Sequence, residues 1–100
     1  MTVPPNAERH QAHVTAGPGG VMTEEVGCIT GELTVVTTAF PTGQAWVAVQ
    51  TRGADEWYTL TGTPTPLPMG ESLAHYHQRV LDAVRTGGET VAPPAAGTGQ

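Results

Sequence analysis

Three short runs rich in threonine and valine, separated by two glycine-containing turns, constrain the fold of this chain most strongly. The runs cover residues 32–40, 45–52 and 57–63. Side chains branched at Cβ crowd a helix but suit the pleated surface of a sheet, so each run predicts a strand. The turns at Gly43 and Gly53 are short, and consecutive strands are therefore expected to pair antiparallel. Together the runs predict an antiparallel β-meander.

Two further segments flank the meander. Residues 21–30 alternate weakly, and Gly27 leaves open whether they form a fourth strand. Residues 70–86 carry apolar side chains at helical spacing and predict a C-terminal helix capped by Gly70 or Ser72. The predicted apolar stripe consists of Leu73, His77, Val80, Leu81 and Val84. We therefore expect an α+β fold: a three- or four-stranded antiparallel β-meander with one C-terminal helix packed on one face.

Glycine and proline mark two tails around this core. The 100-residue chain holds 13 glycines and 9 prolines, and six of these 22 residues fall within residues 1–20. Residues 89–100 have a similar composition. Segments with so little apolar surface cannot offset the entropy lost on ordering. We therefore expect a disordered arm at residues 1–20, one small domain at residues 21–88 and a disordered tail at residues 89–100.

The charge balance argues against several classes of partner. The chain has four arginines, no lysine and nine acidic residues, which gives a net charge of −5. Nucleic acids and anionic membranes recruit clustered basic residues, so neither is an expected partner. The first residues lack the pattern of a signal peptide, and a cytoplasmic location is expected. The absence of lysine is typical of a GC-rich bacterial genome.

No set of residues predicts catalysis or metal binding. The single serine, Ser72, is expected to cap the helix. Cys28 has apolar neighbours and is expected to be a structural, unreactive thiol. His75 and His77 lie on opposite sides of the predicted helix and cannot share one ion, while His77 is expected in the core. We therefore predict a protein that is not an enzyme and has no metal or cofactor.

The aromatic residues suggest a binding surface. Alternation along the second run puts Trp46, Gln50 and Arg52 on the face away from the valine-rich core face. If Arg52 pairs directly with Trp57 across the second turn, Trp57 joins them. An open sheet face with two tryptophans and an arginine is typical of a contact surface. The alternative, that the helix covers this face and both tryptophans are core residues, stays open.

The leading functional hypothesis is a small, non-catalytic binding or regulatory protein that acts through protein–protein contacts. The foldable part has about 68 residues, near the limit for independent stability, and the whole chain has five leucines and one isoleucine. A homodimer with Trp46 near its interface, or one formed by pairing a free edge strand, would supply the missing buried area. Two alternatives remain. One is a nucleic-acid-linked regulator, such as an antitoxin-like or transcription accessory protein; the other is a small-ligand or metal carrier that uses the histidines.

Overall fold

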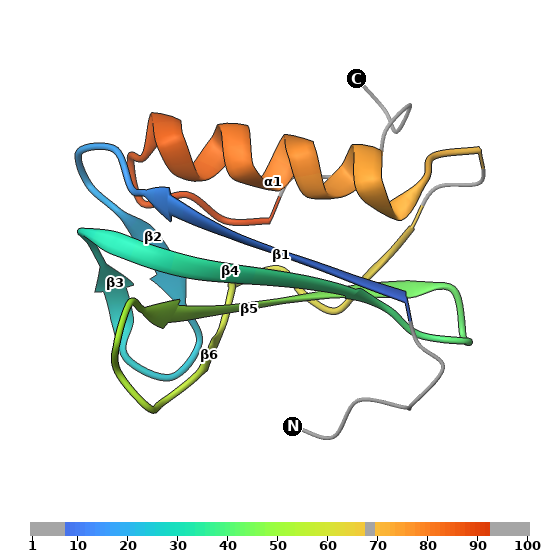
Figure 1. The fold of residues 1–100 in the computed structure, drawn as a ribbon, viewed down its shortest axis with the longest axis horizontal. Coiled ribbons are helices and arrows are strands. Elements are labelled where there is room, and N and C mark those ends of the chain that lie inside the picture. The colour runs from blue at the N-terminus through green and yellow to red at the C-terminus, as the bar shows by residue number, and fades with distance from the viewer. Residues whose placement is uncertain (1–7, 68–69, 93–100) are drawn as a thin grey trace.

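The computed structural model describes residues 8–67 and 70–92, which form a main antiparallel sheet covered by one helix and a small second sheet (Figure 1). The five-stranded sheet has the order β1-β4-β5-β6, and β7 also pairs with β5. Its strands are β1 (Glu8–Thr15), β4 (Glu32–Ala39), β5 (Gln44–Thr51), β6 (Tyr58–Thr59) and β7 (Thr65–Pro66). A separate two-stranded sheet joins β2 (Val21–Thr23) to β3 (Gly27–Ile29), and the helix is α1 (Leu73–Thr86).

The predicted architecture, an antiparallel sheet with a C-terminal helix on one face, is confirmed. The sheet has five strands rather than three or four. The first two β-rich runs form β4 and β5, which pair from Leu33↔Thr51 to Ala39↔Ala45. The third run contributes only the short strand β6. Residues 21–30 form the β2–β3 hairpin instead of a fourth strand of the main sheet.

The prediction that residues 1–20 form a disordered arm is wrong for residues 8–20. Strand β1 pairs with β4 along its whole length, from Glu8↔Ala39 to Thr15↔Glu32. Composition alone missed this strand because its order comes from non-local pairing and from the burial of Val14 in the core. Residues 1–7 lie outside the described part of the chain.

The predicted C-terminal tail, residues 89–100, is also partly ordered. The Thr90 N–H donates to the carbonyl of Gly20 at 3.0 Å, and the Ala92 N–H donates to that of Thr61 at 2.8 Å. These bonds hold the chain after α1 against the start of β2 and the residues after β6. Residues 93–100 lie outside the described residues.

The hydrophobic core lies between α1 and the sheet. Alternation turns Leu33, Val35 and Val47 toward the helix, where they are fully buried. The helix contributes the buried side chains of Leu73, Tyr76, His77, Val80, Leu81 and Val84. The predicted cap is confirmed, because the Ser72 hydroxyl accepts a hydrogen bond from the His75 N–H at 3.1 Å. Of the described residues, no helix is long or apolar enough to cross a membrane.

The end of the helix is pressed against the end of β1. Gly87 follows α1 with φ of 75°, a conformation that favours glycine. A Cβ atom at Gly87 would overlap the backbone of Gly17 and Pro18. The neighbouring Gly88 N–H donates to the Pro18 carbonyl at 2.6 Å. This close approach fixes the helix over the first strand.

Candidate functional site

A pocket of about 300 Å³ opens on the side of the sheet away from α1. It is lined by Glu25, Trp46, Ala48, Trp57, Tyr58 and Thr59. Trp46 and Ala48 point into it from β5, since their neighbours Ala45 and Val47 are buried under the helix. The helix therefore does not cover Trp46, and the alternative in which it did is wrong.

The pairing of β5 with β6 determines which aromatic residues meet. Ala48 pairs with Thr59, and Val49 pairs with Tyr58. Continued by one residue, this register puts Trp57 opposite Gln50, so the expected direct pairing of Arg52 with Trp57 is wrong by two residues. The strands separate there because residues 52–57 form an open loop rather than a tight hairpin turn. Because side chains alternate between the two faces of a sheet, a change of two residues in the pairing keeps Trp57 on the same face as Trp46. Both tryptophans therefore line the same pocket.

Glu25 brings a carboxylate to the pocket from the turn between β2 and β3. The Thr59 N–H donates to Glu25 Oε1 at 2.7 Å, and the Thr59 hydroxyl donates to Oε2 at 2.8 Å. The backbone bond is the main cause that lowers the pKa of Glu25 below its ordinary value. The carboxylate is therefore charged at neutral pH. Sequence reasoning gave Glu25 no partner, because Thr59 lies 34 positions away.

Two further acidic residues, Glu24 and Glu56, are hydrogen-bonded to residues that line this opening. The Tyr58 hydroxyl donates to Glu56 Oε1 at 3.0 Å, a bond that raises the pKa of Tyr58. The backbone N–H of Glu24 donates to the Thr59 carbonyl at 2.9 Å. None of the described residues that line the pocket is basic. The pocket therefore combines aromatic walls with a negative rim.

The two tryptophans differ in how firmly they are held. Trp46 is half-buried and packs edge-to-face against Phe40, with ring centroids 5.6 Å apart. Its indole Nε1 is buried and has no hydrogen-bond acceptor in the part of the chain that the structure describes. Trp57 is 42% exposed. Trp46 thus forms a fixed wall, and Trp57 forms the wall open to solvent.

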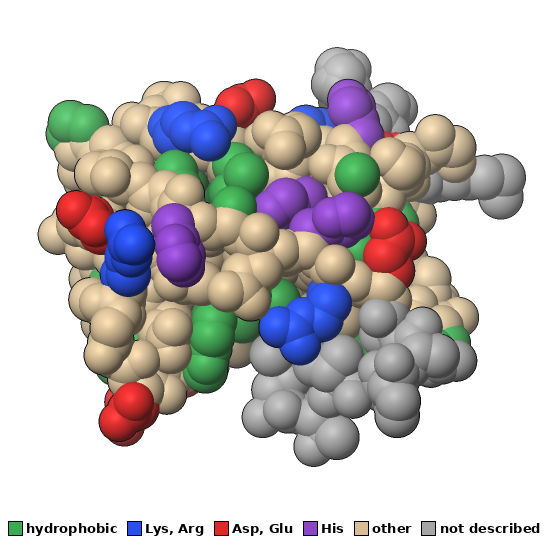
Figure 2. Space-filling model, viewed as in Figure 1, with side chains coloured by type: hydrophobic (Ala, Val, Ile, Leu, Met, Phe, Trp, Pro, Cys, Tyr) green, Lys and Arg blue, Asp and Glu red, His purple; other side chains and the backbone are tan. Residues whose placement is uncertain are grey.

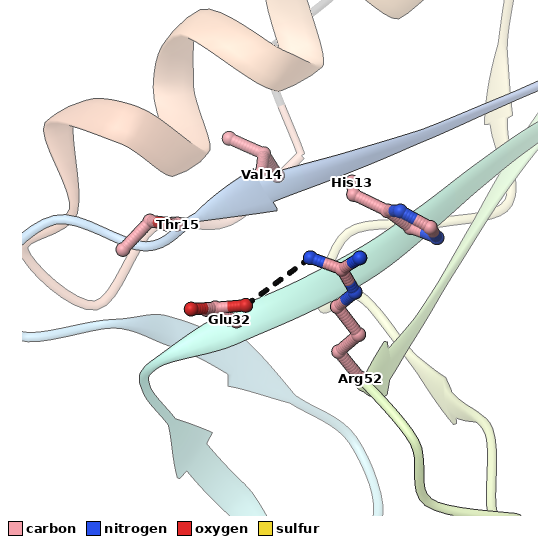
Figure 3. Close-up of a pocket in the computed structure, with 5 residues that line it drawn as sticks. All are labelled: His13, Val14, Thr15, Glu32 and Arg52. Carbon is pink, nitrogen blue, oxygen red and sulfur yellow. Dashed lines mark hydrogen bonds and ion pairs between the residues drawn. The ribbon is translucent and has the colours of Figure 1, made fainter.

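The other two residues of the predicted binding surface lie apart from this pocket. Arg52 lines a smaller pocket of about 120 Å³, together with His13, Val14, Thr15 and Glu32 (Figure 3). There Arg52 Nη1 is 3.3 Å from Glu32 Oε1, and both side chains are exposed. Gln50 is half-buried on β5 and lines neither of these two pockets. The predicted surface is therefore split: Trp46 and Trp57 meet, while Arg52 and Gln50 do not join them.

The expected core histidine is confirmed. His77 is 4% exposed, its Nδ1 is 2.7 Å from the Thr37 hydroxyl, and its ring stacks on that of His10. Burial lowers the pKa of His77, and electrostatic repulsion from the neighbouring His10 lowers it further. Figure 2 shows histidine side chains gathered between α1 and β1. His75 instead lies in solvent, with its Nδ1 2.8 Å from Glu71 Oε2.

The remaining candidates for metal and thiol chemistry are the histidines and Cys28. Among the described residues, no group of three or more His, Cys, Asp or Glu side chains is placed to hold a metal ion. Cys28 is a free thiol exposed on β3, so the expectation of a structural cysteine is wrong. The reason is that β3 belongs to the small two-stranded sheet, where Cys28 faces solvent between two half-buried neighbours.

Comparison of the chain with models of protein families, with curated proteins and with solved structures found no match.

Proposed function

We propose that this protein is a small, non-catalytic binding protein that holds a segment of a partner protein in the pocket between Trp46 and Trp57. The observation that carries this proposal is that the two tryptophans come from a strand and a loop yet line one pocket of about 300 Å³. Aromatic side chains in pockets contribute a large share of the binding energy at protein interfaces.

The chemistry of the pocket supports binding rather than catalysis. Its ionisable side chains are Glu25 and Tyr58. Both are held by hydrogen bonds, Glu25 to Thr59 and Tyr58 to Glu56. Neither forms part of a nucleophile–base pair among the residues that line the pocket. A rigid carboxylate between aromatic walls is a recognition element.

Selection from a random peptide library displayed on phage tests this function. Peptides are selected on the wild-type protein and then tested on Trp57→Ala and on Thr42→Ala, which changes an exposed residue of the β4–β5 turn that does not line the pocket. We expect selected peptides to bind the Thr42→Ala variant as they bind the wild type and to lose binding to Trp57→Ala. Peptides that bind all three proteins equally would contradict the proposed site.

We also propose that the protein forms a homodimer through the free edge of β1. In the described part of the chain, β1 ends the sheet, and no strand pairs with its outer edge. In an antiparallel pair, the backbone groups of every second residue point toward the partner strand. The Ala16 N–H donates to the Gly31 carbonyl at 2.9 Å, so the even-numbered residues bond to β4 and the odd-numbered residues of β1 direct their backbone N–H and C=O groups outward. An unpaired strand of eight residues is a template for pairing with a second copy.

Charge complementarity supports an antiparallel pairing of β1 with itself. With Ala12 opposite its own copy, Arg9 lies opposite Thr15, which pairs with Glu32 in each subunit. Glu32 of one subunit then lies one strand beyond the residue opposite Arg9 of the other, so the two charges are brought to the same part of the joined sheet. The face that carries Trp46 is a weaker candidate for this contact, because Val36 and Ala48 on it are already buried within one subunit.

We further propose that the protein works in the cytoplasm. The observation that supports this location is the exposed thiol of Cys28. A free exposed thiol persists in a reducing compartment and is oxidised outside one.

A further inference from the structure

The pocket between Trp46 and Trp57 has the chemistry of a cation site. The flat faces of tryptophan and tyrosine carry negative charge density and attract cations, and tryptophan does so most strongly. Two of the residues that line this pocket are Trp46 and Trp57, whose side chains lie on the face away from α1. Two indole rings in one pocket of about 300 Å³ can flank an ammonium or guanidinium group.

Glu25 supplies the opposite charge in a fixed position. Each of its two oxygens accepts one hydrogen bond from Thr59, at 2.7 Å and 2.8 Å. A carboxylate oxygen has two acceptor sites, so each oxygen keeps one for a further donor. Because Thr59 already orients the carboxylate, a ligand would not have to order it.

The surroundings favour a cation as well. The turn that holds Glu25 also holds Glu24, and the loop before Trp57 holds Asp55 and Glu56. Four of the nine acidic residues of the chain therefore belong to the two segments that meet at this pocket. Like charges gathered on one side of a protein raise the local concentration of opposite charge.

The sequence limits the source of that cation. The chain has no lysine, so a second copy cannot supply one. Three of its four arginines already pair with carboxylates: Arg52 with Glu32, Arg79 with Glu71 and Arg85 with Asp82. The fourth, Arg9, lies on β1, at the opposite end of the sheet order from β6 and in the proposed dimer contact. The cation is therefore assigned to a different molecule, and an acidic protein with a net charge of −5 attracts a basic segment.

We propose that the pocket holds the charged end of a lysine or arginine side chain from a basic segment of the partner protein. This inference rests on the proposed function and names the chemistry that the site recognises. The ammonium or guanidinium group lies against the rings of Trp46 and Trp57 and donates to the carboxylate of Glu25.

Titration of the ¹⁵N-labelled protein with short peptides tests the inference. The peptides are acetyl-Gly-Gly-X-Gly-Gly-amide, where X is lysine, arginine or norleucine, the uncharged analogue of lysine. Tetramethylammonium chloride serves as a cation without a peptide. We expect the indole N–H signals of Trp46 and Trp57 to shift with the lysine and arginine peptides at millimolar concentration. We expect norleucine to bind about fivefold more weakly or worse.

Two carboxylate variants give a matched comparison. Glu25→Gln keeps an acceptor for the Thr59 N–H and removes the charge, so we expect the lysine peptide to bind about fivefold more weakly. Glu32→Gln removes a carboxylate at the other pocket and should leave this affinity unchanged. Amide spectra that match the wild type would establish that both variants are folded.

The outcomes separate this inference from the proposed function. Equal shifts with lysine and norleucine would overturn the cation and leave a binding pocket for an apolar side chain. If tetramethylammonium shifts the indole signals and the lysine and arginine peptides do not, the proposal that a lysine or arginine side chain supplies the cation is overturned. An unchanged affinity in Glu25→Gln would overturn the role of the carboxylate. If no probe moves either indole signal, both this inference and the proposed function are contradicted.

Discussion

The carboxylate of Glu25 is clamped by Thr59, which donates to it through both its backbone N–H and its hydroxyl. This pair ties the turn of the small β2–β3 hairpin to the edge of the main sheet. It also fixes a negative charge beside Trp46 and Trp57, which belong to β5 and to the loop before β6. The binding pocket exists because these three segments meet there.

Removal of the Thr59 hydroxyl should leave the Glu25 carboxylate with one of its two hydrogen bonds from Thr59. Thr59→Val keeps the backbone donor and removes the side-chain donor, and both bonds lower the pKa of Glu25 from its ordinary value of 4.5. We expect the pKa of Glu25, followed by its side-chain carbon signal in NMR, to lie below 4.5 in the wild type and to rise in the variant. Thr61→Val serves as the control and should leave this pKa unchanged. A wild-type pKa at or above the ordinary value would contradict the clamp.

His77 should make the stability of the fold depend on pH. Burial lowers its pKa from the ordinary value of 6.5, so the unfolded chain binds a proton more readily than the folded one. Stability is then fully present above about pH 6.5 and is lost as the pH falls toward the lower folded pKa. The groups that face His77 are His10 and Thr37, and His10 Nε2 is 3.0 Å from Glu8 Oε2. Thermal unfolding between pH 5 and pH 8 measures the effect.

The matched variant replaces the buried pair together. His77→Leu alone would leave the buried Thr37 hydroxyl without its hydrogen-bond partner, which lowers the free energy of unfolding by about 1–3 kcal/mol. The double variant His77→Leu/Thr37→Val avoids this cost and should show a flatter pH dependence. His75→Gln changes an exposed histidine and should keep the wild-type slope. A double variant as sensitive to pH as the wild type would show that His77 does not cause the dependence.

The glycine contact between α1 and β1 should be intolerant of a side chain. Gly87→Ala combines a positive φ with overlap of the Gly17 backbone, and we expect it to destabilise the fold by more than about 3 kcal/mol. Gly53 also has a positive φ but nothing within 4 Å of an added Cβ. Gly53→Ala should therefore cost only about 1–2 kcal/mol. Urea denaturation of both variants measures the difference, and equal costs would contradict the close contact.

The proposed dimer predicts a specific effect of proline at the edge of β1. The Gln11 N–H points outward, so Gln11→Pro removes a donor from the free edge without removing a bond to β4. We expect sedimentation equilibrium at micromolar concentration to give twice the 10.4 kDa chain mass for the wild type and for Gln11→Ala. Gln11→Pro should sediment as a folded monomer. A monomeric wild type would overturn the dimer, and a dimeric Gln11→Pro would move the interface elsewhere.

The elements that could be predicted from sequence are those with local signals. The β4–β5 hairpin and α1 follow from β-branched alternation, from Gly43 and from the Ser72 cap. Strand β1 could not be predicted, because its residues are mostly polar and its pairing partner lies in β4. In the site, alternation alone placed Trp46 on the outer face. The loop that shifts Trp57 away from Arg52 and the bond from Thr59 to Glu25 depend on tertiary contacts and leave no local pattern.

The central claim, that the pocket between Trp46 and Trp57 is the binding site, is tested most directly by calorimetric titration of a phage-selected peptide. Trp57 is 42% exposed, so Trp57→Ala should keep the melting temperature of the wild type. We expect this variant to bind the peptide at least about tenfold more weakly. Val91→Ala shortens another exposed apolar side chain, 48% exposed and outside the pocket, and should bind like the wild type. An unchanged affinity in Trp57→Ala would contradict the account.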